Sequence, residues 1–292
     1  MGMPSGIGIV DTMIGFPEAD FAMYDKMKAA FKDPDSKDAE FPAEYMFKNV
    51  PKEVYGASDP VAVTLKEMDR WGIEYALVAV DNAWEDGKVA ERACKEHPDR
   101  FIAHANLNPN AGVEGLRRMV RLHEAFGLKA FAVFPCGLQP QVGLDEALMY
   151  PVYAKCVELG VPLFANAGIP GPRFPMWPQE VARLDKVMYD FPELVLVTRH
   201  GCEPWEDLAV KLMVKWPNLY FSTSAFAPKF YPKAVIDYAN TRGADKIIYG
   251  GYWPMGLSLE RIMGELQNVP FKDHVWPKFL RENALRVLKI GQ

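Results

Sequence analysis

Eight short apolar runs alternate with amphipathic stretches along nearly the whole chain, and this alternation restricts the possible folds more than any other feature. The runs are rich in Val, Ile, Phe and Ala, as expected for parallel strands that are buried on both faces. The predicted strands are Ile7–Met13, Tyr75–Asp81, Phe101–Asn108, Leu128–Pro135, Pro162–Gly168, Leu194–Gly201, Leu219–Ala225 and Lys246–Tyr252.

Helical patterns fill the intervals between these runs. The first, Asp59–Trp71, begins with an Asp cap and a proline, and Gly72 stops it. The others are predicted over Glu85–Glu96, Gly112–Phe126, Leu144–Leu159, Pro178–Asp190, Pro204–Lys215, Pro232–Thr241, Ser258–Gln267 and Val275–Leu288. Eight strand–helix units in 292 residues predict an α/β fold, a (β/α)8 TIM barrel forming a single domain over residues 1–292 with a C-terminal helix.

One long insertion, residues 15–57, separates the first predicted strand from its helix. Because it follows a strand, it belongs to the face of the barrel that carries active sites, and loops of this length are often lids. Its aromatic residues favour an apolar or aromatic substrate; alternatively, they anchor the loop to the barrel. The prolines and aromatics are Pro17, Pro34, Pro42 and Pro51, and Phe16, Phe21, Tyr24, Phe31, Phe41, Tyr45, Phe47 and Tyr55.

Charge and cysteine usage narrow the class of partner. The formal net charge of −5 and the scattered basic residues argue against nucleic acid or an anionic membrane. No stretch approaches the roughly 20 apolar residues of a membrane span, and no signal peptide is evident. The four cysteines, Cys94, Cys136, Cys156 and Cys202, form no C-x-x-C pair, which favours reduced thiols. We expect a cytoplasmic protein that binds a small-molecule substrate.

Three segments resemble the amidohydrolase-2 branch of the amidohydrolase superfamily. Residues 246–256, KIIYGGYWPMG, are similar to the family's last barrel strand, F-G-S-D-Y-P-M. Residues 200–224 resemble its H-x-G-(x)-P-W-x-E, h-P-N-v-Y and d-t-S pattern, and residues 282–287, ENALRV, resemble its E-N-A-x-R-L tail. The resemblance implies a barrel with a terminal helix packed under it, and a homo-oligomer, since homodimers are common in this branch.

The positions that match the family's metal ligands carry other side chains here. The opening I-D-x-H-x-H is replaced by residues 10–15, VDTMIG, so that Met13 and Gly15 stand at the two imidazole positions. Asn166 matches the His of strand five, and Tyr252 matches the Asp of strand eight. Thioether, amide and phenol are poor ligands for a hard or borderline cation. We therefore predict no metal and no cofactor; a metal held by an unrecognised ligand set is the alternative.

The remaining polar residues predict proton transfer. His200, at the family's strand-six position, is the predicted general acid or base, because imidazole titrates near neutral pH. Tyr252 is predicted to donate a proton or hydrogen bond to a carbonyl oxygen, and Asp11 to orient His200 or pair with an arginine. Inert packing of Tyr252 and a structural role for Asp11 are the alternatives. Strand alternation allows either Arg199 or His200, but not both, to face the barrel axis.

Six further side chains are predicted to contact the substrate, because they lie near the carboxyl end of a strand. An amide can donate to an oxyanion, and a guanidinium can hold a carboxylate with two hydrogen bonds. The six residues are Asn166, Arg199, Arg173, Met13, Trp253 and Ser224.

Three functions follow from this pattern. The leading prediction is metal-independent acid–base hydrolysis of a mostly apolar, carbonyl-containing small molecule such as an ester, lactone or amide, the family default. The alternative is a lyase, a decarboxylase or a hydratase/dehydratase, that acts on an aromatic or carboxylate substrate, because relatives in this branch decarboxylate aromatic acids. The third is a non-catalytic binder of small molecules that has inherited the scaffold.

Overall fold

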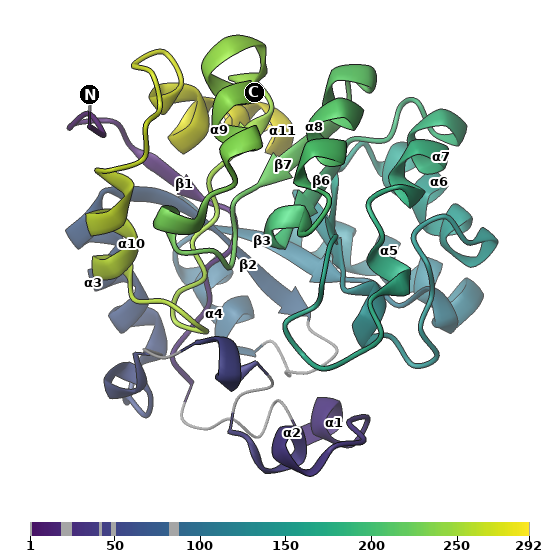
Figure 1. Ribbon diagram of the computed structural model, residues 1–292. Helices are drawn as coiled ribbons and strands as arrows, with labels where there is room; N and C mark the ends of the chain where they lie inside the picture. Colours follow the sequence, from purple (N-terminus) through teal and green to yellow (C-terminus); the bar gives the residue numbers. More distant parts are fainter. Residues whose placement is uncertain (1, 19–24, 41–42, 48–50, 82–87, 292) are drawn as a thin grey trace.

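The computed structural model describes residues 2–18, 25–40, 43–47, 51–81 and 88–291. Its sheet has eight strands in the order β1 to β8, and each neighbouring pair is parallel. The helices surround the strands (Figure 1), which confirms the predicted (β/α)8 barrel. The strands are β1 (Ile9–Asp11), β2 (Ile73–Asp81), β3 (Phe101–Asn106), β4 (Ala130–Val133), β5 (Leu163–Asn166), β6 (Leu196–Arg199), β7 (Leu219–Ser222) and β8 (Ile247–Ile248).

The first of the outer helices, α3, shows the predicted caps: Asp59 accepts hydrogen bonds from two backbone N–H groups of its first turn, and Gly72 ends it at φ 68°. The helices of the barrel are α3 (Pro60–Trp71), α4 (Lys88–Glu96), α5 (Gly112–Phe126), α6 (Tyr150–Leu159), α7 (Arg183–Asp190), α8 (Glu206–Lys215), α9 (Lys233–Tyr238), α10 (Leu259–Leu266) and α11 (Asn283–Leu288). No helix in the described part of the chain is long and apolar enough to span a membrane.

Short 3-10 and π segments replace parts of several predicted helices. Pro178 lies in a 3-10 turn instead of opening α7, and the predicted last helix contains a π segment in its first half. The start of the predicted helix over Glu85–Glu96, residues 85–87, lies outside the described residues. The segments are η2 (Glu44–Met46), η3 (Lys52–Val54), η4 (Pro109–Ala111), η5 (Pro135–Gly137), η6 (Ala147–Met149), η7 (Trp177–Gln179), η8 (His200–Cys202), η9 (Pro228–Phe230), η10 (Ala239–Gly243) and η11 (Lys278–Glu282).

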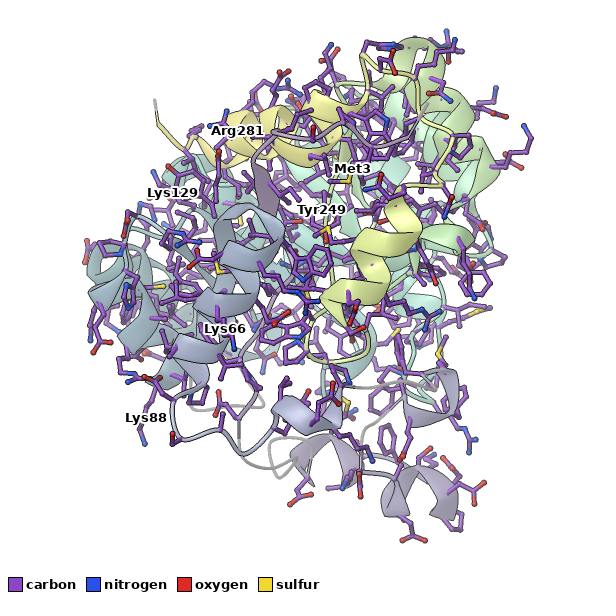
Figure 2. The ribbon with its side chains drawn as sticks, turned by 90° about the vertical axis from the view of Figure 1, so that its left-hand side faces the viewer. Met3, Lys66, Lys88, Lys129, Tyr249 and Arg281 are labelled. Atoms are coloured by element: carbon purple, nitrogen blue, oxygen red, sulfur yellow. The ribbon has the colours of Figure 1, made fainter. Side chains whose placement is uncertain are left out.

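The barrel closes through the segments that follow β8 and β1. The Gly15 N–H donates to the Trp253 carbonyl at 2.8 Å, and the Gly251 N–H donates to Asp11 Oδ1, also at 2.8 Å. A Cβ on Gly251 would lie 2.5 Å from Asp11 Oδ2, so only glycine permits this approach. Tyr249, labelled in Figure 2, is fully buried in the segment that follows β8. The close approach explains why β8 is much shorter than predicted.

The C-terminal helix covers the amino-terminal end of the barrel. Ala284, Val287 and Leu288 of α11 pack against inward-facing strand residues, which are Val10, Leu77, Ala130, Ala132, Phe164, Val197 and Ile248. Figure 2 shows Arg281, just before α11, at the end of the molecule opposite to α1 (Asp25–Lys28) and α2 (Pro34–Asp38). Because α11 covers the amino-terminal end of the barrel, a site can form only at the carboxyl ends of the strands.

The described parts of the insertion of residues 15–57 lie at that other end (Figure 1) and are tied to the loop after β5. Tyr45 Oη donates to the Gly171 carbonyl at 2.6 Å, and Arg173 Nη1 pairs with Asp33 Oδ1 at 2.6 Å. The Phe31 and Phe174 rings pack with centroids 4.9 Å apart. Some aromatic residues of the insertion therefore anchor the loop to the barrel, which was one of the two roles predicted for them. Of the prolines and aromatics named in the sequence analysis, Phe21, Tyr24, Phe41 and Pro42 lie outside the described residues.

Candidate active site

A cavity of about 780 Å³ lies at the carboxyl ends of the strands, under the insertion. Its outer part is lined by lid residues such as Phe16, Tyr45, Phe47 and Tyr55, so lid aromatics also contact the cavity. Its inner part is lined by side chains from the strands. The polar residues of the lining include His104, Asn106, Asn166, Gln179, Arg199, His200, Glu203 and Tyr252.

His200 lines the cavity and is held by Ser224, which follows β7. Ser224 Oγ lies 3.2 Å from His200 Nδ1 and accepts the His200 backbone N–H at 3.3 Å. Because Nδ1 is engaged, Nε2 is the ring nitrogen left for a bound molecule. Burial, with a smaller contribution from Arg199, lowers the pKa of His200 to about 3. The imidazole of the empty cavity is therefore neutral at neutral pH, and one ring nitrogen carries a free lone pair.

Several residues near His200 have strained backbone conformations. Four residues have positive φ angles, which residues other than glycine rarely adopt. They are His200 at 66°, Cys202 at 63°, Ala225 at 70° and Tyr252 at 141°. All four follow the carboxyl ends of β6, β7 or β8, and three of them line the cavity. Strain of this kind persists where the surrounding structure enforces it, and it is concentrated at functional sites.

The strain also explains how Arg199 and His200 both reach the cavity. Strand alternation would turn only one of them inward. However, β6 ends at Arg199, and the left-handed φ of His200 turns the next side chain toward the same space. The expectation that only one of Arg199 and His200 could face the barrel axis is therefore wrong.

Tyr252 lies between the lid and His200. Its ring stacks on Phe47 with centroids 5.6 Å apart and meets the edge of the His200 ring at 5.4 Å. Burial raises the pKa of Tyr252 to about 12, although Arg199 opposes the shift. The phenol therefore stays protonated at neutral pH and presents a hydrogen-bond donor.

Asp11 is not part of the cavity lining. Its Oδ1 accepts the backbone N–H groups of Met13 at 2.9 Å and Gly251 at 2.8 Å. Burial raises the pKa of Asp11 to about 7, although these two hydrogen bonds oppose the shift. Asp11 thus connects the segments after β1 and β8 that carry Met13 and Tyr252.

The other predicted substrate contacts fall into two groups. Met13 and Asn166 line the cavity. Trp253 is 2% exposed and belongs to the core, Ser224 lies behind His200, and Arg173 binds the lid near the cavity mouth. The structure thus brings Met13, Asn166, Arg199, His200 and Tyr252 together and leaves Trp253 and Arg173 outside the lining.

His104, Asn106, Gln179 and Glu203 line the cavity but were not among the predicted site residues. His104 lies in the middle of β3, and its two-residue spacing from Asn106 places both on the inward face. Gln179 Nε2 donates to the Gly168 carbonyl at 3.0 Å, and its Oε1 accepts the Cys136 N–H at 3.3 Å. The pKa of Glu203 is raised by burial and by Glu206. The positions of Asn106 and Glu203 near strand ends were visible in the sequence, whereas those of His104 and Gln179 in the cavity were not.

The fold and the position of this cavity define a (β/α)8-barrel protein with its candidate site at the carboxyl ends of the strands. A family model described as amidohydrolase matches residues 33–290. The chain belongs to this family, which confirms the resemblance found in the sequence. A comparison with curated proteins gives no match.

Several solved structures share the fold. An uncharacterized TIM-barrel protein from Bordetella bronchiseptica is 21% identical, with a TM-score of 0.72 over 97% of this chain and 99% of that one. The 5-carboxyvanillate decarboxylase of Novosphingobium aromaticivorans, complexed with manganese and a nitrobenzoic acid, is 16% identical, with 0.70 over 98% and 97%. The 4-oxalomesaconate hydratase of Rhodopseudomonas palustris is 18% identical, with 0.61 over 96% and 95%. At these identities the similarity concerns the fold.

The side chains at four positions that match the family's metal ligands do not suit a divalent cation such as manganese. Met13, Gly15, Asn166 and Tyr252 offer a thioether, no side chain, a neutral amide and a protonated phenol, whereas manganese prefers carboxylate, imidazole and water ligands. Within the described residues, no group of three or more His, Cys, Asp or Glu side chains is arranged to hold a metal ion. No catalytic step is therefore derived through a metal.

Proposed function

We propose that the protein is a lyase that acts by proton transfer, without a metal, on a small and mostly apolar molecule bearing a carboxylate or carbonyl group. The observation that carries this proposal is the pair formed by a neutral imidazole and a protonated phenol, His200 and Tyr252, whose ring centroids are 5.4 Å apart in the cavity. At neutral pH the imidazole has a free lone pair and the phenol keeps its proton, which are the complementary protonation states that general acid–base catalysis needs.

The similar structures favour a lyase over a hydrolase. Those with a stated activity above are a decarboxylase and a hydratase. In decarboxylation, the bond to the carboxylate carbon breaks, CO₂ leaves, and a proton takes its place on the remaining carbon. In hydration, water adds across a double bond. Both reactions need a proton to be moved at one carbon, which is general acid–base catalysis.

His200 and Tyr252 divide this work according to their pKa values. Water supplies the proton in both reactions: His200 accepts it at Nε2, since Ser224 occupies Nδ1, and passes it to the substrate carbon. The hydroxide that remains adds to the released CO₂ in decarboxylation or to the double bond in hydration. Tyr252 donates a hydrogen bond to an oxygen of the substrate, which stabilises negative charge that develops during the reaction. The Phe47 ring, stacked on Tyr252, keeps water from this side of the phenol.

The size and walls of the cavity suit a substrate with one or two rings. Its volume of about 780 Å³ is within the roughly 300–1,000 Å³ of small-molecule sites. Phe16, Phe134 and Phe226 supply aromatic surfaces on which a flat ring can pack.

The proposal is tested with panels of aromatic carboxylates, unsaturated carboxylates, esters and lactones, whose products are identified by mass spectrometry. We expect loss of CO₂ from an aromatic acid, or gain of one water by an unsaturated acid. His200→Asn should lower turnover by roughly 10²–10⁴-fold, the usual contribution of a general acid or base. His274→Asn, at an exposed histidine outside the cavity, should not change it.

Two results would contradict the proposal. Cleavage of esters or lactones, with the acids untouched, would identify a hydrolase. Tight binding of panel compounds with no product formed from any of them would identify a non-catalytic binder.

A further inference from the structure

Arg199 is a buried cation at the inner end of the cavity, the end lined by strand residues rather than lid residues. Its side chain is 4% exposed, and no Asp or Glu among the described residues forms an ion pair with it. Nη2 donates to the Thr12 carbonyl at 3.3 Å, and the guanidinium lies 4.9 Å from the centroid of the Phe164 ring. Its Nε has no hydrogen-bond partner.

His104 is a second buried polar group at this end. It is 5% exposed, lines the cavity, and has no partner for Nδ1. The two residues belong to β3 and β6, so they approach the cavity from different sides of the barrel. Arg199 lies close enough to lower the pKa of His104, although burial lowers it more. The inner end of the cavity therefore holds two nitrogens without hydrogen-bond partners, Arg199 Nε and His104 Nδ1, and one positive charge without a counter-ion.

Such an arrangement is costly unless something compensates it. A buried charge without a counter-ion is strongly unfavourable, and buried nitrogens nearly always find partners. The Thr12 carbonyl and the Phe164 ring compensate Arg199 only in part, because neither carries a formal negative charge. An anion that enters the cavity would supply both the missing charge and the missing acceptors.

We propose that Arg199 and His104 form the binding site for the substrate's carboxylate, so that a fixed guanidinium supplies the positive charge that a metal ion would otherwise provide. This inference rests on the proposed function, whose substrate class it narrows to carboxylates. A carboxylate matches the planar guanidinium by accepting two of its N–H groups, and His104 donates to it through a ring N–H.

The site also gives the substrate an orientation. With its carboxylate at Arg199 and His104, the apolar part of the molecule extends along the aromatic walls toward the lid. His200 and Tyr252 line the same cavity and are close enough to Arg199 for its charge to affect the pKa of each. The reacting carbon therefore lies at or next to the carbon that bears the carboxylate.

Ligand binding, measured by calorimetry without turnover, tests this inference. The probes are benzoate, phenylacetate and 1-naphthoate, each compared with the corresponding neutral amide. We expect the wild-type protein to bind at least one carboxylate at least tenfold more tightly than its amide. Arg199→Met, which keeps much of the side-chain volume but removes the charge, should abolish this preference, and His104→Phe should reduce it. Arg242→Met removes an exposed arginine outside the cavity lining and should not change it.

Amide binding, together with thermal unfolding, reports whether the Arg199→Met protein is folded. Equal affinity for carboxylate and amide in the wild type, no binding of any carboxylate, or a preference retained in folded Arg199→Met would overturn the inference. Failure of the carboxylate site can be distinguished from failure of the proposed lyase function. Carboxylates that bind but do not react would refute the lyase alone, whereas lyase activity on a neutral carbonyl compound would refute the carboxylate site alone.

Discussion

At the scale of single residues, hydrogen bonds decide what the candidate catalytic groups can do. His200 and Ser224 come from segments 24 positions apart in the chain, and the contact of Ser224 Oγ with His200 Nδ1 directs Nε2 toward a ligand. Ser224 does not line the cavity, so we regard it as a positioning residue whose effect passes through His200.

Ser224→Ala should therefore lower kcat with little change in KM. Losing one hydrogen bond of about 0.5–1.5 kcal/mol predicts a fall of roughly two- to tenfold, since about 1.4 kcal/mol corresponds to a factor of ten in rate. Steady-state kinetics on the substrate found in the panels measures the effect. Ser222→Ala is the matched control, because Ser222 lies on the same β7 segment and its Oγ faces Thr12 instead, at 3.5 Å. An unchanged kcat in Ser224→Ala would refute the positioning role.

Asp11 has a structural effect that depends on pH. Because its pKa is raised from 3.8 to about 7, the folded protein holds a proton that the unfolded chain releases. The folded state therefore binds more protons than the unfolded state between these values, and the free energy of unfolding falls as pH rises through this window. Above about pH 7 this contribution has been lost.

Asp11→Asn should remove that pH dependence. An amide oxygen still accepts the N–H groups of Met13 and Gly251, but an amide never ionises. The variant should gain stability relative to the wild type between pH 4 and 7, by on the order of a few kcal/mol. Urea unfolding across this range measures it, and the difference between the two proteins cancels the titration of the histidines. Parallel curves would show that Asp11 does not carry the effect.

At the scale of elements, the sequence predicted which strands and helices exist, and their order, better than it predicted where each one begins and ends. The eight apolar runs identified all eight strands, because parallel strands buried on both faces leave a continuous apolar signal. β8 is much shorter than predicted because Gly250 and Gly251 bring the chain against Ser222 and Asp11 in β7 and β1. That contact is tertiary and leaves no mark in the local pattern.

The C-terminal helix α11 is expected to contribute strongly to stability, since it covers one end of the barrel. Leu288 is 1% exposed in that contact. Leu288→Ala should lower the free energy of unfolding by about 2–5 kcal/mol, the usual result for a buried leucine. Leu148→Ala is the matched control, because Leu148 is 45% exposed and should change stability by less than about 0.5 kcal/mol. Chemical unfolding compares the two, and equal values would show that α11 is not part of the core.

At the scale of the whole molecule, the barrel places the ends of distant strands around one cavity, and the sequence could predict only part of the outcome. Met13, Asn166, His200 and Tyr252 were identified by their match to the family's ligand positions, and Arg199 by its position at a strand end. His104 was missed because its role depends on which face of β3 is turned inward. The hydrogen bond of Ser224 to His200 was invisible, since it depends on a left-handed turn that no local pattern indicates.

The central claim is that an amidohydrolase-family barrel performs proton-transfer lyase chemistry on a carboxylate without a metal. The most direct test is to measure loss of CO₂ from, or addition of water to, the best panel substrate before and after exhaustive chelation, with metal content determined by elemental analysis. We predict unchanged turnover by protein that contains far less than one metal ion per chain. Turnover that disappears on chelation and returns with manganese would contradict the account.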